Sequence, residues 1–488
     1  MKDMHHNSSK RKTRARLAFV YTLMGLVIVA GVTILVLILQ GYRFNRYDGK
    51  VEQGGLVQFD SKPAGATVTL DGTRLAAKTA SKLTVSAGTH NVTIAKDGYL
   101  PWTKTVAVKA GSVLWLNYAR PYPVTPKITS MYSYDLVTSA LISPNRKQIV
   151  AVGPANQSFL YVTPLNDGNP ETHKIAIQSD AITPANDTAS ASFSLVSWDQ
   201  DNQYVIMKHV HDGATEYLSV DTNNGNAINI TKTLGVTAER LEYVIGDHNA
   251  IYVMTSAHEL RRGDVSAGTL SGPLLSGIAD FAQADRSTVT YETQLASDGT
   301  RSVGYLTNGA SRARKVQTVK DDGTPSLKFR MGTYYGDQYL IVAYGDTTTI
   351  YTAAVPSSDS SSTLNWTRVG WLTTTGGVSY LGFSPDTERF VYAQMQHTVA
   401  TYDLETDVIA KVTLQGAASR AVDWMDNFHV GSTSGNAAYF YDFDGTNARA
   451  VASSVSDMSI TISENDKYLY YFAPDGVKIV LKRVQLVN

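Results

Sequence analysis

Cysteine is absent from this chain of 488 residues. Without thiols the protein can form no disulfide bond and no thiolate metal site, and it has no cysteine nucleophile. Large exported eukaryotic proteins usually carry disulfides. The absence of cysteine, together with the apolar segment described below, therefore favours a bacterial surface protein.

An excess of charge of either sign is also lacking. Lys plus Arg and Asp plus Glu each number 43, and charged residues make up only 18% of the chain. No global charge attracts a nucleic acid, so we expect no nucleic-acid partner. The 43% of apolar residues exclude a largely disordered chain, and the 28 Tyr are typical of strands.

One long apolar run lies near the N-terminus, where Leu17–Leu39 form 23 residues without a charge. At about 1.5 Å per residue this run is long enough to cross a hydrocarbon core of about 30 Å. A cleaved signal peptide would have a shorter apolar region followed by an A-x-A-like site, but here Gln40-Gly41-Tyr42-Arg43 follows. The run predicts an uncleaved transmembrane helix over 17–39, with the lipid bilayer as its partner.

The charges on either side of this helix predict its orientation. Six basic residues precede it against the single acidic Asp3, whereas acidic residues offset the basic residues that follow. The positive-inside rule then places a basic tail, 1–16, in the cytoplasm and a stalk, 40–53, outside. We predict a single-pass protein of the cell membrane with extracellular C-terminal domains. The preceding basic residues are Lys2, Lys10, Arg11, Lys12, Arg14 and Arg16.

The segment 54–120 predicts a small β-domain. Short runs of alternating apolar and polar residues are separated by the turn signals Asp71-Gly72, Ala87-Gly88 and Asp97-Gly98. This spacing predicts a series of short strands joined by hairpins.

At Lys62-Pro63-Ala64-Gly65-Ala66, and again at Leu70-Asp71-Gly72, Ala87-Gly88-Thr89-His90 and Asp97-Gly98-Tyr99, this segment resembles the PEGA domain. It departs from the family where Ala64 replaces a Glu and where Ala80-Ser81 replaces a Thr-Pro, neither of them a core position. The resemblance implies a small β-sandwich-like module of bacterial surfaces that serves attachment or spacing, with no catalysis.

Three prolines, Pro121, Pro123 and Pro126, predict a stiff linker over 121–130. From there to the C-terminus, over 131–488, a loose repeat of about 40–50 residues is typical of four-stranded propeller blades. It predicts a β-propeller of eight blades, with seven as the alternative, and a C-terminal strand that completes the ring. The repeats begin near Leu141, Val196, Tyr243, Phe281, Tyr334, Leu381, Val422 and Ile460. The copy FSPDTERFVYA, from Phe383, resembles the TolB-type propeller repeat.

A search for chemistry yields no phosphate loop, dinucleotide fingerprint or HExxH helix in the sequence. Gly431–Gly435 has Thr where a nucleophile elbow needs Ser, and Asp442–Asn447 lacks the closing Glu of a calcium loop, so both favour hairpin turns. His209 and His211, beside Asp212, alternate along one strand and could share a metal, but no third ligand is evident nearby. We therefore assign no catalytic, cofactor-binding or metal residue and expect no cofactor.

Large aromatic residues leave two interpretations open. They either pack between blades or line a sugar-binding face, and packing is favoured for Trp198, Trp366, Trp371 and Trp424. The sequence thus predicts a non-enzymatic, membrane-anchored surface protein whose propeller binds a protein or a cell-envelope glycan. The alternative is a propeller hydrolase, a lactonase or glycosidase, with its site at the central channel, and a purely structural spacer is a third possibility.

Overall fold

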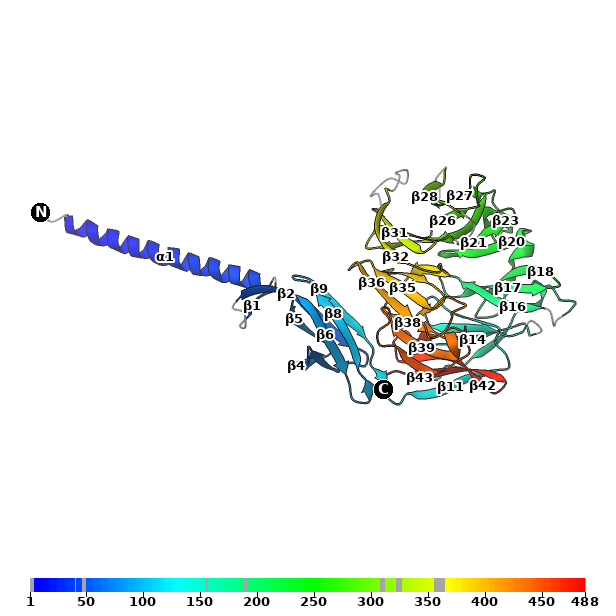
Figure 1. Ribbon diagram of the computed structural model, residues 1–488, viewed down its shortest axis with the longest axis horizontal. Coiled ribbons are helices and arrows are strands. Elements are labelled where there is room, and N and C mark those ends of the chain that lie inside the picture. Colours follow the sequence, from blue (N-terminus) through cyan, green and yellow to red (C-terminus); the bar gives the residue numbers. More distant parts are fainter. Residues whose placement is uncertain are drawn as a thin grey trace. The chain divides into compact units, whose positions relative to one another are not determined.

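The computed structural model describes residues 4–39, 41–45, 50–154, 157–187, 191–307, 312–321, 327–354 and 365–487. The chain divides into two compact units, Met1–Thr125 and Pro126–Asn488 (Figure 1). The boundary falls within the segment that its prolines marked as a linker. Strands account for most of the second unit and for most of the first unit beyond its helix, as predicted.

Helix α1, Met4–Leu39, contains the predicted apolar run. Its segment Arg16–Ile38 has a mean hydropathy of 2.5, and none of it is buried in the protein. A helix of a soluble domain buries its apolar stripe against the protein, and this helix does not. The predicted apolar helix is therefore present, and it is long enough to cross a membrane.

The residues assigned to a stalk form a β-hairpin in their described part. Strand β1, Tyr42–Asn45, pairs antiparallel with the first residues of β2, Lys50–Ser61. The amide of Gly54 also donates a hydrogen bond of 2.9 Å to the carbonyl of Gly41. The sheet of the first unit thus begins almost where the helix ends.

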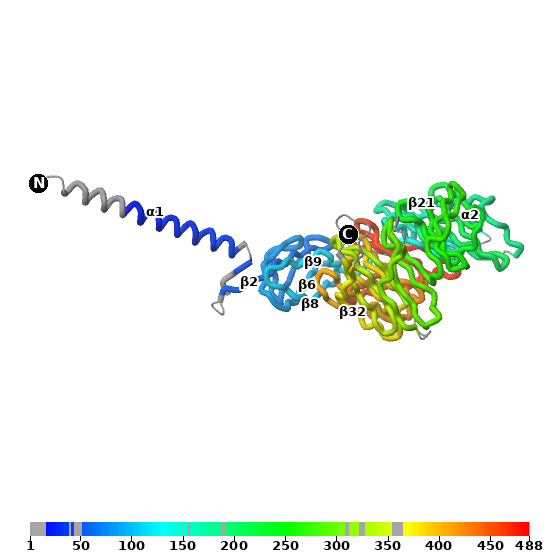
Figure 2. Tube along the Cα trace, turned by 90° about the horizontal axis from the view of Figure 1, so that it is seen from above, coloured from blue at the N-terminus to red at the C-terminus, as the bar shows by residue number. Residues whose placement is uncertain are grey.

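Two four-stranded sheets and the short pair of β7 with β10 build the rest of the described part of the first unit, whose backbone Figure 2 traces. One has the order β1-β2-β5, with β9 parallel to β2, and the other has the order β4-β3-β6-β8. Phe59, Val68 and Trp102 are fully buried in its core. The hairpins predicted at Asp71-Gly72 and Asp97-Gly98 are confirmed by the pairs β3–β4 and β6–β8, whereas Ala87-Gly88 leads from β5 in one sheet to β6 in the other. The parallel β2–β9 pair, which joins distant segments, was not foreseen. The strands are β3 Thr67–Leu70, β4 Thr73–Lys78, β5 Ser81–Ser86, β6 Gly88–Ala95, β7 Tyr99–Leu100, β8 Trp102–Val108, β9 Val113–Ala119 and β10 Tyr122–Pro123.

Antiparallel sheets make up the second unit, and its described residues contain eight of them. The first strand of one sheet contacts the first strand of the next, as β12 does with β16 and β29 with β33, so these strands form the inner wall of a ring. The first four sheets are β12 Ser139–Ile142, β13 Gln148–Val152, β14 Phe159–Pro164 and β15 His173–Ala176; β16 Ser192–Trp198, β17 Tyr204–His211, β18 Ala214–Asp221 and β19 Ala227–Asn229; β20 Ala238–Val244, β21 Asp247–Thr255, β22 Glu259–Asp264, β23 Thr269–Leu270 and β24 Leu275–Ser276; β25 Ile278–Gln283, β26 Thr288–Thr293, β27 Thr300–Thr307 and β28 Arg314–Lys320.

The next three sheets are β29 Lys328–Tyr334, β30 Asp337–Tyr344, β31 Thr347–Ala354 and β32 Thr367–Thr373; β33 Tyr380–Phe383, β34 Phe390–Gln394, β35 Thr398–Asp403 and β36 Val408–Thr413; β37 Asp423–Trp424, β38 His429–Ser432, β39 Ala437–Asp442 and β40 Arg449–Ser453. The eighth combines β41 Thr461–Ile462, β42 Tyr468–Asp475 and β43 Lys478–Gln485 with β11 Lys127–Tyr134. The described short helices are α2 Ile230–Leu234, η1 Ser179–Ala181 and η2 Ser434–Asn436.

Each repeat found in the sequence lies on the first two strands of a different sheet and on the turn between them. The polar residue at that turn has a common task. The hydroxyl oxygens of Ser143 and Ser463 each accept a hydrogen bond of 3.1 Å from a backbone amide at the start of the second strand. The sequence repeat therefore reflects the need for a polar side chain that accepts these amide hydrogen bonds at each turn.

The eighth sheet joins the two ends of the propeller. Strand β11 pairs antiparallel with β43 from Lys127↔Gln485 to Tyr134↔Ile479, and β11 is the outermost strand. The C-terminal strand was expected to complete the ring, but the N-terminal strand lies outside it. Strand β11 also starts within the predicted linker, because an extended proline-rich backbone can pair at a sheet edge.

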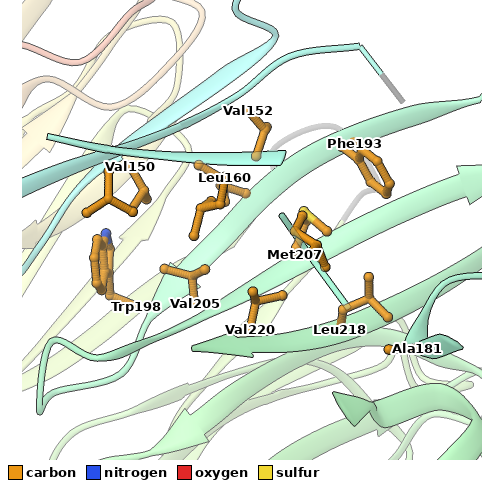
Figure 3. Packing of buried hydrophobic residues seen from close by; sticks show 13 residues of the cluster. Val150, Val152, Leu160, Ala181, Phe193, Trp198, Val205, Met207, Leu218 and Val220 are labelled. Atoms are coloured by element: carbon orange, nitrogen blue, oxygen red, sulfur yellow. The ribbon is translucent and has the colours of Figure 1, made fainter. Parts of the chain in front are cut away.

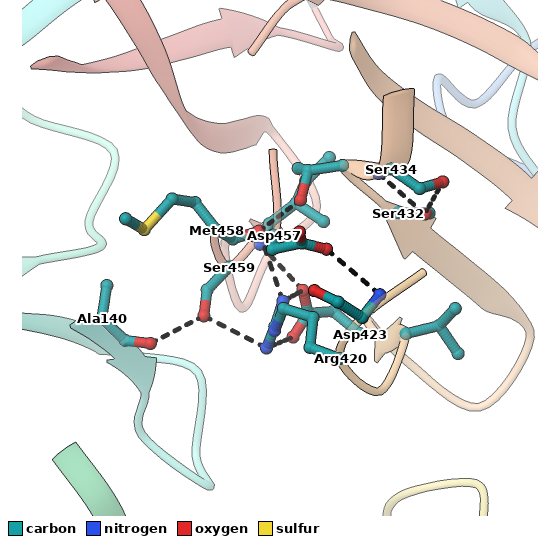
Figure 4. A network of polar contacts seen from close by, with 12 residues as sticks. Ala140, Arg420, Asp423, Ser432, Ser434, Asp457, Met458 and Ser459 are labelled. Atoms are coloured by element: carbon teal, nitrogen blue, oxygen red, sulfur yellow. Dashed lines mark hydrogen bonds and ion pairs between the residues drawn. The ribbon is translucent and has the colours of Figure 1, made fainter. Parts of the chain in front are cut away.

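Polar contacts also connect the seventh, eighth and first sheets, where the two ends of the propeller meet (Figure 4). The guanidinium of Arg420 forms a two-point ion pair with Asp423, at 2.6 and 3.0 Å, and donates to the hydroxyl of Ser459 on the closing side. Ser459 in turn donates to the carbonyl of Ala140 on β12. Three neighbouring sheets are thus linked where the chain's ends meet.

Apolar side chains fill the space between neighbouring sheets (Figure 3). Between the sheet of β12–β15 and the sheet of β16–β19, Val150, Leu160 and Val205 are fully buried together with Met207 and Leu218. Each sheet buries apolar residues on both faces because it has a neighbour on each side. This explains the nearly continuous apolar stretches of the middle strands.

Substitution of Leu481 tests the closing sheet. Leu481 is fully buried in one core with Tyr134, Tyr470 and Phe472. Leu481→Ala should lower the free energy of unfolding by about 2–5 kcal/mol, because it leaves a cavity in a packed core. Urea unfolding of the full chain in detergent measures the change. Val477→Ala, at a residue that is 96% exposed in the same hairpin, should have no effect. Equal stability of both variants would contradict this role of the closing sheet.

Candidate functional site

Two histidines and a glutamate meet at the hairpin of β17 and β18. His209 and His211 lie at the end of β17, and the register places Glu216 of β18 directly opposite His209. All three are buried, and each can direct one ligand atom into a space in which these atoms lie within 4.8 Å of one another. The expectation that no third ligand lies nearby was therefore wrong. The sequence could have revealed this third ligand, because the two-residue turn Asp212–Gly213 sets the register of the hairpin and thereby places Glu216 opposite His209.

The carboxylate of Glu216 is fully engaged. It accepts hydrogen bonds from Nδ1 of His209 at 2.9 Å, from the amide and hydroxyl of Thr183 at 2.8 and 2.5 Å, and from Nδ2 of Asn229 at 2.7 Å. Burial alone would raise the pKa of Glu216, but the bonds from His209, Thr183 and Asn229 outweigh it and lower the pKa to about 2. Glu216 is therefore ionised at neutral pH.

The hydrogen bonds of Glu216 hold separate segments of the chain together. Glu216 ties the segment before β16, through Thr183, to the end of β19, through Asn229. The rings of His209 and His211 stack with their centroids 4.8 Å apart and so support each other's position. Four donors already occupy the carboxylate, which accepts about four bonds. The cluster is thus better suited to hold the hairpin than to bind a metal.

Charged residues also lie on the inner strands. Arg240 on β20 pairs with Glu242 on the same strand and with Asp280 on β25 of the neighbouring sheet. All three side chains are about one-quarter to one-third exposed. Since Arg240 neutralises both carboxylates, neither is placed as a free proton acceptor, and the trio links two sheets.

The outer edge of the propeller has a different character. Val369 and Trp371 on β32 are 43% and 56% exposed, and Val408 and Ile409 on the next outer strand, β36, are 54% and 57% exposed. The two strands belong to neighbouring sheets, and the hydroxyl of Tyr402, which is paired with Ile409, donates to the carbonyl of Val369 at 3.5 Å. We call the two outer strands with these four exposed side chains the outer apolar surface. The side chains do not share one face, because successive residues of a strand point to opposite sides: Leu372 packs in the core shared with the sheet of β33–β36, so Trp371 points away from it. Sequence patterns did not reveal this surface, because apolar and polar residues alternate along outer strands as they do along the other strands.

The remaining residues considered in the sequence analysis lie in turns or pack against other side chains. Ser432 and Ser434 lie 2.9 Å apart in the short connection between β38 and β39, and Asp442 accepts from Asn447 across a hairpin tip at 2.9 Å. Packing is observed for three of the four tryptophans: Trp198 is 9% exposed, Trp366 packs at 6.1 Å against Tyr305, and Trp424 stacks at 6.0 Å on Phe390. The fourth, Trp371, belongs to the outer apolar surface.

The ring of antiparallel sheets defines the class of this protein: a β-propeller, preceded by a small β-domain and an apolar helix. Residues 55–121 match the PEGA domain family, so the small domain is a PEGA domain, as the resemblance implied. No curated protein matches the chain.

Several solved propellers are similar to this chain. They include the β-propeller domain of Cps50 (Swd1) from Myceliophteria thermophila, at 10% identity over 73% of this chain and 99% of that chain, with a TM-score of 0.40. The Dos1 propeller has 11% identity over 74% and 94%, with a TM-score of 0.42. An oligogalacturonate lyase in complex with manganese has 10% identity over 74% and 98%, with a TM-score of 0.39. These likenesses concern the fold alone, and they transfer no activity or ligand to this chain.

The pH dependence of stability tests the role of Glu216. A carboxyl group whose pKa is lowered by folding stabilises the protein above its ordinary pKa and loses that contribution as the pH falls through the folded value. Glu216→Gln should therefore lower the free energy of unfolding by about 3 kcal/mol at pH 7. The difference from wild type should shrink between about pH 5 and pH 2. Urea unfolding at several pH values measures it, with the exposed Glu171→Gln as the control. A difference that does not depend on pH would contradict the assignment.

Proposed function

We propose that this is a non-enzymatic, membrane-anchored protein whose propeller binds a partner protein. The observation that carries the proposal is the outer apolar surface. Edge strands that carry exposed large apolar side chains are a liability in a monomeric protein, and a bound partner protein can cover both the edge and the side chains. The PEGA domain between helix and propeller then serves as the spacer.

The composition of this surface favours a protein over a glycan. Three of its four side chains are aliphatic, and only Trp371 could stack on a sugar ring. Both strands lie at the edge of their sheets, so in the described part of the propeller no further strand pairs with them. An extended segment of a partner could add to such an edge and cover the apolar side chains at the same time.

The hydrolase alternative has less support. Glu242 and Asp280 are the carboxylates that the inner strands bring together, and both pair with Arg240. A catalytic acid or base needs a carboxyl group that faces its substrate, whereas these two carboxylates are engaged by the guanidinium of Arg240.

Substitution on the outer apolar surface tests the proposal. Trp371→Ser combined with Ile409→Ser should reduce partner cross-linking at least about tenfold, because exposed aromatic and aliphatic anchors supply most of the binding energy at an interface. Cross-linking of the full-length, tagged protein in its own cells, followed by mass spectrometry, identifies the adducts. Val477→Ser alters an equally apolar and 96% exposed residue outside the surface and should retain them. Unchanged protein adducts in the double variant would refute the proposal.

We also propose that the propeller faces the outside of the cell. The absence of cysteine makes this testable, because a single introduced thiol is the only reactive one. A membrane-impermeant maleimide on whole cells should label Val477→Cys, whereas it should label Lys10→Cys only after permeabilisation. The opposite pattern would reverse the topology, and loss of residue 10 from the mature protein would indicate a cleaved signal peptide.

A further inference from the structure

The turn between β16 and β17 is capped by an aspartate where other turns use serine. Oδ1 of Asp199 accepts from the amides of Gln203 and Tyr204 at 2.8 and 2.9 Å. In the corresponding turns of the first and eighth sheets, Ser143 and Ser463 accept the same pair of amide bonds through one hydroxyl oxygen. One oxygen is therefore sufficient for the turn, and the carboxylate of Asp199 brings a second.

That second oxygen is buried and unused. Asp199 is only 2% exposed, and its Oδ2 has no hydrogen-bond partner among the residues that the structure describes. An isolated carboxylate oxygen in a buried place is unfavourable, because it has lost water without gaining a donor. Such an exception in a native structure calls for a cause outside the turn itself, such as an ion.

Two further ligand groups face the same space. Asp201 belongs to the same turn, and His248 comes from β21 of the neighbouring sheet. One ligand atom from each of Asp199, Asp201 and His248 can lie within 4.8 Å of the others. The ring of His248 stacks on Tyr204, with centroids 4.4 Å apart and an interplanar angle of 11°, so its orientation is supported.

The surroundings hold this turn in place and favour a cation. Asn202, which directly follows Asp201, accepts from the amide of Asn145 at 2.8 Å and from Nε2 of Gln148 at 2.7 Å. The two carboxylates make the site negative, and the contacts of Asn202 hold the turn that carries them.

We propose that Asp199, Asp201 and His248 bind a divalent transition-metal ion of the manganese-to-zinc series. One imidazole nitrogen and two carboxylate oxygens suit these ions, whereas calcium and magnesium prefer oxygen ligands throughout. Solvent completes the coordination shell. The ion joins the second sheet to the third across a face of the ring and neutralises the buried oxygen of Asp199. The histidine cluster at the other end of β17 differs in this respect, because four donors already satisfy Glu216.

Titration of the metal-free, full-length protein in detergent with zinc chloride or manganese chloride tests the site. A His5→Gln, His6→Gln background removes the adjacent histidines of the N-terminal tail. We expect one ion per chain at this site. Asp199→Ser and His248→Gln should each weaken its binding at least about tenfold, since each removes a ligand. Asp199→Ser should nevertheless fold, because serine caps the same turn in two other sheets. Its thermal midpoint without metal confirms this.

Two control variants complete the experiment. His173→Gln alters an exposed histidine of β15 and should bind the ion as wild type does. His211→Gln removes a member of the other cluster and should also leave the affinity unchanged. Wild-type affinity in both Asp199→Ser and His248→Gln would overturn the proposal. So would a loss of binding in His211→Gln alone, or the absence of binding by the wild type to either ion.

Discussion

The pairing of β11 with β43 is the constraint on which the rest of the propeller depends. Each sheet is apolar on both faces and is stable only between two neighbours. A row of such sheets would leave a bare apolar face at either end. By adding an N-terminal strand to the last sheet, the chain brings the two ends together, and Tyr134 and Leu481 become buried in one core. The hydroxyl of Ser459 adds a polar contact between the two ends, since it donates to the carbonyl of Ala140 in the first sheet.

Closure also determines where function can reside. Inner strands are packed and paired, as the Arg240 trio shows, so the positions open to variation are turns, hairpins and outer strands. The two clusters with metal-ligating side chains lie at opposite ends of β17, and the outer apolar surface lies on β32 and β36. A rigid ring thus carries its candidate sites where substitution least disturbs the packing.

Local patterns predicted the apolar helix, the hairpins of the PEGA domain and the repeats of the propeller. These features depend on residues close in the chain, such as the 23 uncharged residues of Leu17–Leu39 or the two-residue turn at Asp71–Gly72. The repeats were recognised because each turn needs a polar cap at the same place, as Ser143 and Ser463 show. In contrast, the partners of His209 were missed, although the turn at Asp212–Gly213 already implied the position of Glu216.

The sequence by itself determined the class of each segment, because hydropathy and turn chemistry are local properties of the chain. Only the tertiary structure decided which distant residues meet. It placed β11 beside β43, Asp280 beside Arg240, and His248 of one sheet beside Asp199 of another. Such encounters depend on how strongly twisted sheets succeed one another around a ring, and no spacing along the chain encodes that geometry.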